Sequence, residues 1–268
     1  MKLAISNIAW PPEDTPGVLD LLQKEGVEWI EVAPSRIWAE PVAATAGERR
    51  TFVRSLEEYG IRVISLHSLL YTRPDLGLFR GGENDRKTIR YLEQLALLAS
   101  DLGARWMVFG SPKNRQKGDL SFDEACEGAA RVFGPAGDTA AASGVTILIE
   151  PLTRAESDFV NTADEGIGLM KRVASPGFAL HLDAKSVAEE PGDKTELLRR
   201  AHPFFRHFHI NDPDLGPLGS AGTYHGEMGQ ALRRSGYEGH ASIEMRTFPD
   251  HRQVIARSLA LAKRFYIG

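Results

Sequence analysis

Short apolar runs and longer segments with a helical period alternate along almost the whole chain. Each apolar run is bounded by glycine, proline or polar residues, as is typical of a buried strand. In the segments between the runs, apolar residues recur three or four positions apart, which is the pattern of an amphipathic helix. The pattern predicts eight strands, at residues 3–8, 28–33, 62–67, 105–110, 146–150, 178–183, 204–210 and 241–245. It also predicts eight helices, at residues 16–26, 48–60, 85–103, 123–143, 162–173, 193–201, 226–236 and 251–265.

The strict alternation of strand and helix indicates the fold class. Strands that each lead into a helix run parallel and are joined by right-handed crossovers. Eight such units in about 250 residues are typical of a closed (β/α)8 barrel, the TIM barrel. The alternative is an open, doubly wound sheet, which would carry a glycine-rich phosphate loop after its first strand. The sequence ISNIAWPPED at residues 5–14 contains no glycine, so we expect an α/β protein with one TIM-barrel domain over residues 1–268.

Charge and cysteine content narrow the kinds of partner. The 32 Lys and Arg residues against 36 Asp and Glu residues give a formal net charge of −4, without the basic excess of nucleic-acid binders. Cys126 is the only cysteine, so no disulfide can form within the chain. The N-terminal residues lack a signal-peptide core, and no apolar run reaches the length of about 18 residues that a membrane span needs. We expect a soluble, cytoplasmic protein that binds a small molecule and neither nucleic acid nor membrane.

Four polar residues stand at the ends of the last four predicted strands: Glu150, Asp183, His209 and Glu244. In a TIM barrel the C-terminal ends of the strands meet at one mouth, so these side chains are expected to converge there. Three converging carboxylates repel one another unless a positive charge neutralises them. Any one of the four alone is explained as a helix N-cap or a hydrogen-bonded core group. Their repetition on four successive strands predicts one bound divalent metal ion.

The donor set indicates which ion is expected. Oxygen-rich ligation with a single imidazole favours Mn²⁺ or Mg²⁺, with Co²⁺ and Zn²⁺ as alternatives. We take Mn²⁺ as the expected ion.

Four motifs carry a resemblance to a known family: EPLTRAE at 150–156, HLDAKS at 181–186, HFHIND at 207–212 and GYEG…SIE at 236–244. With them, nearly the whole chain resembles the xylose-isomerase-like barrels. The resemblance is to the sugar or sugar-phosphate isomerase and epimerase branch, which includes ketose 3-epimerases, hydroxypyruvate isomerase and inosose dehydratase. It implies that Glu150, Asp183, His209 and Glu244 bind one Mn²⁺ or related ion. It also implies that His67 and Glu156 contact the substrate.

Two positions depart from the family pattern. Many relatives have a histidine three residues after the metal-binding aspartate, where this chain has Ser186. Many also have an arginine shortly after the seventh strand, and NDPDLGPLGS at residues 211–220 has none. Both family residues usually contact substrate oxygens. The departures therefore leave the reaction open without affecting the predicted metal site.

Such a site favours proton transfer beside a carbonyl. A sugar with a carbonyl next to a hydroxyl can chelate the ion, which stabilises the enediolate formed when the adjacent carbon loses its proton. If Glu150 and Glu244 face opposite sides of that carbon, one removes the proton and the other returns it, which gives epimerisation. Return to the neighbouring carbon gives isomerisation, and loss of a β-hydroxyl gives dehydration. The expected enzyme is a metal-dependent sugar isomerase or epimerase, with a keto-sugar or inosose dehydratase as an alternative.

Several other residues are candidates for the pocket. Lys113 and Arg115 follow the fourth strand, and Arg246 lies two residues beyond Glu244, so the three cations together suggest a phosphate or carboxylate on the substrate. A solvated basic loop explains Lys113 and Arg115 equally well. Ser186 is included as a candidate for substrate contact. Glu31 is expected at the rim of the second strand, in a functional role or as a hydrogen-bonding group of the mouth. His181 and His207 are expected to point inward one layer below the mouth, where they pack in the core or support the ligands.

Two further alternatives belong to other functional classes. Apurinic endonucleases share this barrel, but they need about three zinc ions and additional histidines, and the net charge of −4 argues against DNA. A barrel that binds metal and has lost catalysis would explain the two departures from the family. Relatives are often dimers or tetramers, so we expect a homodimer or homotetramer.

Overall fold

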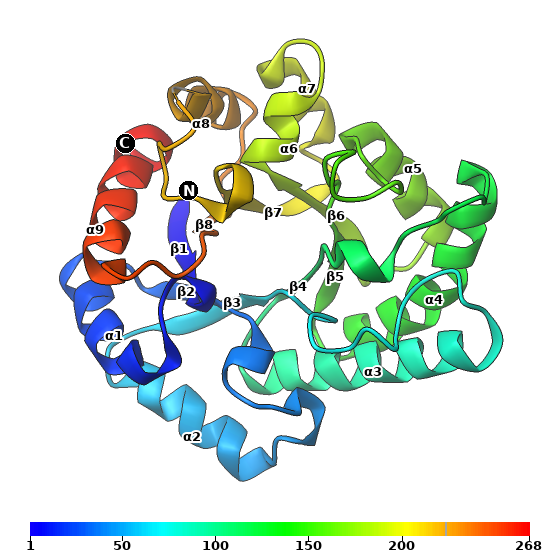
Figure 1. Ribbon diagram of the computed structural model, residues 1–268, viewed down its shortest axis with the longest axis horizontal. Helices are drawn as coiled ribbons and strands as arrows, with labels where there is room; N and C mark the ends of the chain where they lie inside the picture. The colour runs from blue at the N-terminus through cyan, green and yellow to red at the C-terminus, as the bar shows by residue number, and fades with distance from the viewer. Residues whose placement is uncertain (223) are drawn as a thin grey trace.

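Eight parallel strands pair in chain order and close on themselves in the computed structural model, which describes residues 1–222 and 224–268 (Figure 1). The predicted TIM barrel is confirmed. β1 pairs with both β2 and β8, so the first and last strands complete the ring. The strands are β1 (Lys2–Ser6), β2 (Trp29–Val32), β3 (Arg62–Leu66), β4 (Trp106–Phe109), β5 (Thr146–Ile149), β6 (Phe178–Asp183), β7 (Phe205–Ile210) and β8 (His240–Ile243).

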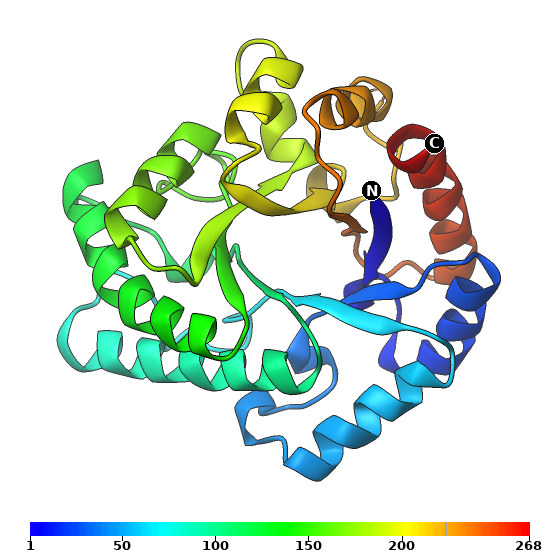
Figure 2. The same cartoon turned by 180° about the vertical axis from the view of Figure 1, so that it is seen from behind.

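Helices surround the strands in an outer ring, which is seen from both sides of the molecule (Figures 1 and 2). Each of the eight predicted helices is present, with ends shifted by a few residues, and the six-residue α6 is an addition that the sequence pattern did not predict. No helix within 1–222 and 224–268 is long and apolar enough to cross a membrane. The helices are α1 (Thr15–Lys24), α2 (Ala46–Glu57), α3 (Gly82–Asp101), α4 (Phe122–Ala142), α5 (Ala163–Val173), α6 (Ala184–Glu189), α7 (Lys194–Ala201), α8 (Tyr224–Arg234) and α9 (His251–Ala262).

Local signals in the sequence explain where these helices begin and end. Thr45 and Ser121 each form a capping box with a glutamate three residues later, at the starts of α2 and α4. Gly103 follows α3 with φ of 76°, a left-handed conformation that glycine adopts without a steric penalty. These signals set where the outer helices begin and end.

The main apolar core lies between the strands and the helices, because alternate strand residues such as Ile147, Ile149 and Leu180 point outward and are buried. The residues between them point into the barrel. There, Val108, Leu148 and Ala179 form a small separate apolar cluster. Toward the C-terminal mouth the inner layer contains polar residues, among them Glu31, Ser65 and His209.

Candidate active site

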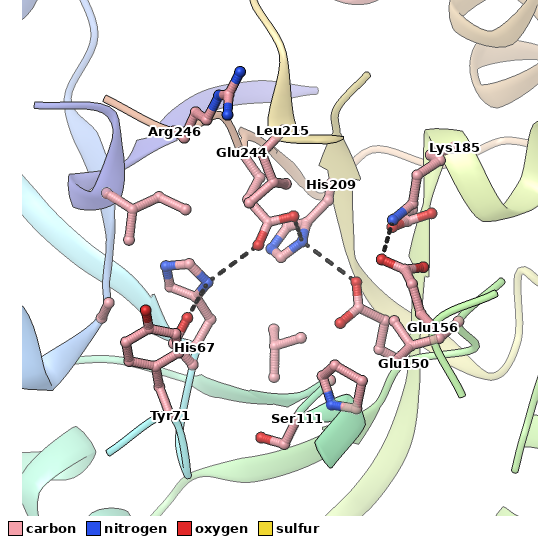
Figure 3. Close-up of a pocket in the computed structure, with 18 of the residues that line it drawn as sticks. His67, Tyr71, Ser111, Glu150, Glu156, Lys185, His209, Leu215, Glu244 and Arg246 are labelled. Atoms are coloured by element: carbon pink, nitrogen blue, oxygen red, sulfur yellow. Dashed lines mark hydrogen bonds and ion pairs between the residues drawn. The ribbon is translucent and has the colours of Figure 1, made fainter. Parts of the chain in front are cut away.

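A cavity of about 600 Å³ opens among the loops that follow the strands. Glu150, Asp183, His209 and Glu244, the four predicted metal ligands, all line it. The structure therefore brings the four strand ends to one place. Figure 3 shows Glu150 and Glu244 on either side of the His209 ring.

The histidine ring faces two of the carboxylates. His209 Nδ1 lies 3.6 Å from Glu150 Oε1 and 3.3 Å from Glu244 Oε2. Asn211 brings the remaining carboxylate close, because its Nδ2 donates to Asp183 Oδ2 at 3.0 Å and to Glu244 Oε2 at 3.2 Å. Asn211 is fully buried. Its role in holding two carboxylates together was not predicted, although it stands in the HFHIND motif directly after β7.

Asp183 is fixed by the turn from β6 into α6. It is the last residue of the strand and the N-cap of the helix, and its Oδ1 accepts a hydrogen bond from Ser186 N at 2.5 Å. An N-cap side chain satisfies a helix N–H that has no partner within the helix. One carboxylate oxygen is thereby used by the backbone, and the other is directed to Asn211 and the cluster.

A buried carboxylate lies beneath the cluster. Glu31 Oε1 is 2.8 Å from His209 Nε2, and Glu31 Oε2 accepts a hydrogen bond from Ser65 Oγ at 2.6 Å and lies 3.1 Å from His207 Nε2. Burial would raise the pKa of Glu31, but His209 and His67 outweigh it and hold that pKa well below its usual range. Glu31 is thus an anion beneath the cluster, and its charge lies next to the His209 ring although the two groups are not aligned for a hydrogen bond.

The donor atoms of the cluster suit a divalent ion. His209 is fully buried, and neither of its ring nitrogens has a hydrogen-bond partner, although Nδ1 faces two carboxylates. Within the described residues, two groups of three have ligand atoms within 4.8 Å of one another: Glu150, His181 and His209, and Glu31, His207 and His209. The first group lies at the cavity, and the second is deeper. His181 was expected as an inner group that packs or supports the ligands, and its position adds it to the candidate ligands.

Burial and the charges within the cluster also shift the pKa values of Glu150 and His209. Burial, together with the Asp183 and Glu244 carboxylates, raises the pKa of Glu150 to about 7 against the lowering effect of His209. Burial would lower the pKa of His209, but Glu31 and Glu244 hold it well above its usual value. Glu150 and His209 therefore retain protons near neutral pH. A divalent cation can replace those protons.

His67 and Glu156, both expected near the substrate, line the cavity. His67 Nε2 is 2.6 Å from Ser6 Oγ, and its Nδ1 lies 3.4 Å from Glu244 Oε1. Glu156 Oε1 forms an ion pair with Lys185 Nζ at 2.6 Å. Lys185 also lines the cavity, and sequence reasoning passed over it although it stands in the HLDAKS motif between Asp183 and Ser186.

Three of the other expected substrate contacts do not line the cavity. Lys113 is exposed on the loop after β4. Arg115 turns inward and is fully buried, with its Nη2 donating to Val160 O at 3.1 Å, so it fixes the loops and does not face the substrate space. Burial lowers the pKa of this guanidinium to about 10. Ser186 is buried beside the start of α6, outside the lining.

Arg246 lines the cavity, as expected. Arg36 lines it too, although no pattern in the sequence identified it as a candidate for substrate contact. Arg36 is the last residue of a short 3-10 helix, Pro34–Arg36, that follows β2. Its position could not be predicted, because the local sequence does not show whether the side chain of a loop arginine points toward the cavity.

Comparisons with known proteins agree with this geometry. A family model described as "Xylose isomerase-like TIM barrel" matches residues 19–265. The L-ribulose 3-epimerase of Mesorhizobium japonicum is 32% identical over 107 residues, which cover 40% of this chain and 36% of that protein. The chain thus spans little more than a third of the length of the first curated relatives it matches. A longer match is to the L-ribulose 3-epimerase of a Methylomonas species, 26% identical over 228 residues, which cover 82% of this chain and 74% of that protein.

Among solved structures, a D-psicose 3-epimerase crystallised in the presence of D-fructose superposes with a TM-score of 0.82. The superposition covers 100% of both chains at 20% sequence identity. At that identity the likeness shows the fold alone.

Proposed function

We propose that this chain, which belongs to the xylose isomerase-like TIM barrel family, is a divalent-metal-dependent enzyme that epimerises or isomerises a ketose. The observation that carries the proposal is the buried cluster of Glu150, Asp183, His209 and Glu244 at the bottom of an open cavity. Curated relatives named ketose 3-epimerases support a sugar as the substrate. Burying carboxylates this close together is costly unless a cation neutralises them.

The four residues of the cluster would hold the ion, with His181 close enough to contribute. When bound, the ion polarises a carbonyl oxygen and stabilises the negative charge that develops on it. Mn²⁺ remains the ion expected from the donor set, which is rich in carboxylate oxygens.

Proton transfer is assigned to Glu150 and Glu244. They come from β5 and β8, on different sides of the ring, and they flank His209 (Figure 3). A substrate carbon placed between them would present one face to each carboxylate. One glutamate takes the proton from the carbon beside the carbonyl, and the other delivers a proton to the opposite face, which inverts the carbon. In the reverse reaction the two exchange roles.

Neighbouring side chains would orient the sugar. His67, held by Ser6, lies beside Glu244, while Glu156, held by Lys185, lies beside Glu150 in the view of Figure 3. His67 and Glu156 thus present polar atoms to the cavity, one beside each of the two proposed proton-transfer groups. We assign them to hydroxyl groups next to the reacting carbon, since fixed hydrogen-bonding groups lower the entropic cost of positioning a flexible sugar.

Solvent-deuterium incorporation tests this function. With Mn²⁺ supplied, a panel of ketoses should yield an epimer that carries deuterium at the carbon beside the carbonyl, detected by NMR. Glu150→Gln and Glu244→Gln should each lower kcat by about 10²–10⁴-fold, because each removes a group that transfers a proton. Full activity in either variant, or in protein treated with a chelator, would contradict the assignment.

The position of the label also separates the alternative reactions. Deuterium on the carbon that lost the proton marks epimerisation, and deuterium on its neighbour marks isomerisation. An unsaturated product marks dehydration. The names of the curated relatives favour epimerisation at carbon 3. A barrel that binds metal without catalysis would give no label in any sugar.

A further inference from the structure

Two arginines line the cavity and have no carboxylate partner among residues 1–222 and 224–268. They differ in this from Lys185, the third cation of the lining, which pairs with Glu156. Arg36 donates from Nη2 to Trp10 O at 2.7 Å, and its Nε is buried without a hydrogen-bond partner. Arg246 is exposed to the cavity and solvent, with its guanidinium 5.3 Å from the centre of the Phe248 ring. Their positive charges are therefore available to a ligand.

Both arginines belong to the same side of the mouth. Arg36 follows β2 and Arg246 follows β8, and these strands flank β1 in the ring. The Lys185–Glu156 pair follows β6 and β5, across the barrel from β1. Figure 3 shows Arg246 and this pair at separate sides of the His209 cluster.

Backbone contacts fix the two arginine-bearing segments. The Nη2 of Arg36 bonds the carbonyl of Trp10, in the loop after β1. The residue after Arg246, Thr247, donates from Oγ1 to Ile8 O at 2.7 Å in the same loop. The backbone N–H of Arg246 donates to Leu215 O at 2.9 Å. The loop after β1 thus holds both arginines beside the cavity.

The distribution of charge in the lining leaves one side for an anion. Four carboxylates line the cavity, from Glu150, Glu156, Asp183 and Glu244, against the three cations Arg36, Lys185 and Arg246. A divalent ion at the cluster would offset the carboxylates there, and Lys185 offsets Glu156. The charges of Arg36 and Arg246 have no such counterpart on their side of the mouth, and fixed positive charges in a concave site attract anionic ligands.

We propose that the ketose bound here carries an anionic group, a phosphate or a carboxylate, which Arg36 and Arg246 bind at the end of the sugar remote from the reacting carbon. This inference rests on the proposed function for the placement of the carbonyl at the metal cluster. Guanidinium groups present paired N–H donors that match the oxygens of both anions. A neutral ketose would leave both arginines without an anionic partner.

Calorimetric binding to the Mn²⁺-loaded protein tests the proposal with D-fructose, D-fructose 6-phosphate and D-fructuronate. We expect at least one anionic sugar to bind about tenfold tighter than D-fructose or better, as charge-assisted hydrogen bonds imply. The stronger of the two identifies the anion as phosphate or carboxylate. Equal or weaker binding of both anionic sugars overturns the proposal.

Variants separate the arginines from the metal ion, which also attracts anions. R36Q and R246Q should each reduce the preference for the anionic sugar, measured as the ratio of its affinity to that of D-fructose, by about tenfold. R36K, which keeps a donor for Trp10 O, should retain part of the preference if R36Q does not fold. Arg234→Gln, the same charge change at an exposed position of α8, should leave all three affinities unchanged. A preference that survives in both R36Q and R246Q overturns the proposal.

Failure of this inference and failure of the proposed function give different results. Deuterium exchange into D-fructose without any preference for an anionic sugar overturns only the anion site. A preference that depends on the arginines, without exchange in any sugar, overturns only the catalytic assignment.

Discussion

At the scale of single residues, the two ring nitrogens of His209 lie in different surroundings. Nε2 is 2.8 Å from the buried Glu31 carboxylate, and Nδ1 faces Glu150 and Glu244 at the cavity. A negative charge beside one nitrogen favours a proton there and leaves the lone pair of the other nitrogen for a metal. The charge of Glu31 therefore favours protonation of Nε2, the tautomer that the proposed metal site needs.

Replacing this carboxylate tests its role. Glu31→Gln keeps the size of the side chain and loses the negative charge beside His209. We expect Mn²⁺ affinity, measured by calorimetry, to fall by about 10–100-fold, which is typical when a group that orients a metal ligand is changed. Glu28→Gln is the matched control, because Glu28 is exposed on the outer side, where it pairs with Arg62. Unchanged Mn²⁺ affinity in Glu31→Gln would show that Glu31 has only a structural role.

Individual residues also show where sequence reasoning stops. Glu150 and Asp183 could be placed at the mouth because strand ends converge in a barrel, whatever the side-chain contacts. Asn211 could not be assigned, since its two carboxylate partners come from β6 and from the segment after β8. Arg115 was expected to contact the substrate, and its inward position could not be predicted for a related reason. Its hydrogen-bond acceptor, Val160 O, lies on another loop. Contacts between distant segments leave no local pattern to read.

At the scale of elements, the turn from β6 into α6 combines a structural and a chemical role in Asp183. One oxygen caps the helix and the other faces the cluster. The sequence predicted the strand up to this residue but not the helix after it, because six residues are too few to show a helical period. The eight longer helices were predicted for the opposite reason, since their apolar stripes cover several turns.

The two roles of Asp183 can be separated by comparing two variants. Asp183→Asn keeps an acceptor for Ser186 N, whereas Asp183→Ala removes it. We expect both variants to bind Mn²⁺ weakly. Only Asp183→Ala should lose the cap, so its free energy of unfolding should be lower than that of Asp183→Asn by about 1 kcal/mol. Urea denaturation of the metal-free proteins measures the difference. Equal stabilities would mean that the cap contributes nothing to the fold.

At the scale of the whole molecule, the proposed metal binding should be coupled to stability. The cluster consists of residues in β6 and β7 and of the residues directly after β5 and β8, so it exists only when the barrel is assembled. A ligand that binds only the folded state stabilises it by mass action, by about 2.7 kcal/mol at 100 times its Kd. We expect such a concentration of Mn²⁺ to raise the Tm by about 5 °C or more, measured by scanning calorimetry.

Protons should oppose this stabilisation. The pKa of Glu150 is raised to about 7 in the metal-free protein, so below that pH the ion must displace a bound proton. The gain in Tm from Mn²⁺ should therefore shrink as the pH falls from 8 to 6. Glu244→Gln provides the control and should show a smaller gain at every pH. A gain that is independent of pH would exclude Glu150 as a ligand.

Because β8 pairs with β1, the order in which the chain is synthesised determines when the site can form. A nascent chain that has emerged only through β7 already contains Glu150, Asp183 and His209 but lacks Glu244. It also lacks Arg246 and the strand that closes the ring onto β1. The cavity can therefore be completed only after β8 has been synthesised. A translation product that stops before β8 would lack one of the four clustered side chains and would leave the barrel open beside β1.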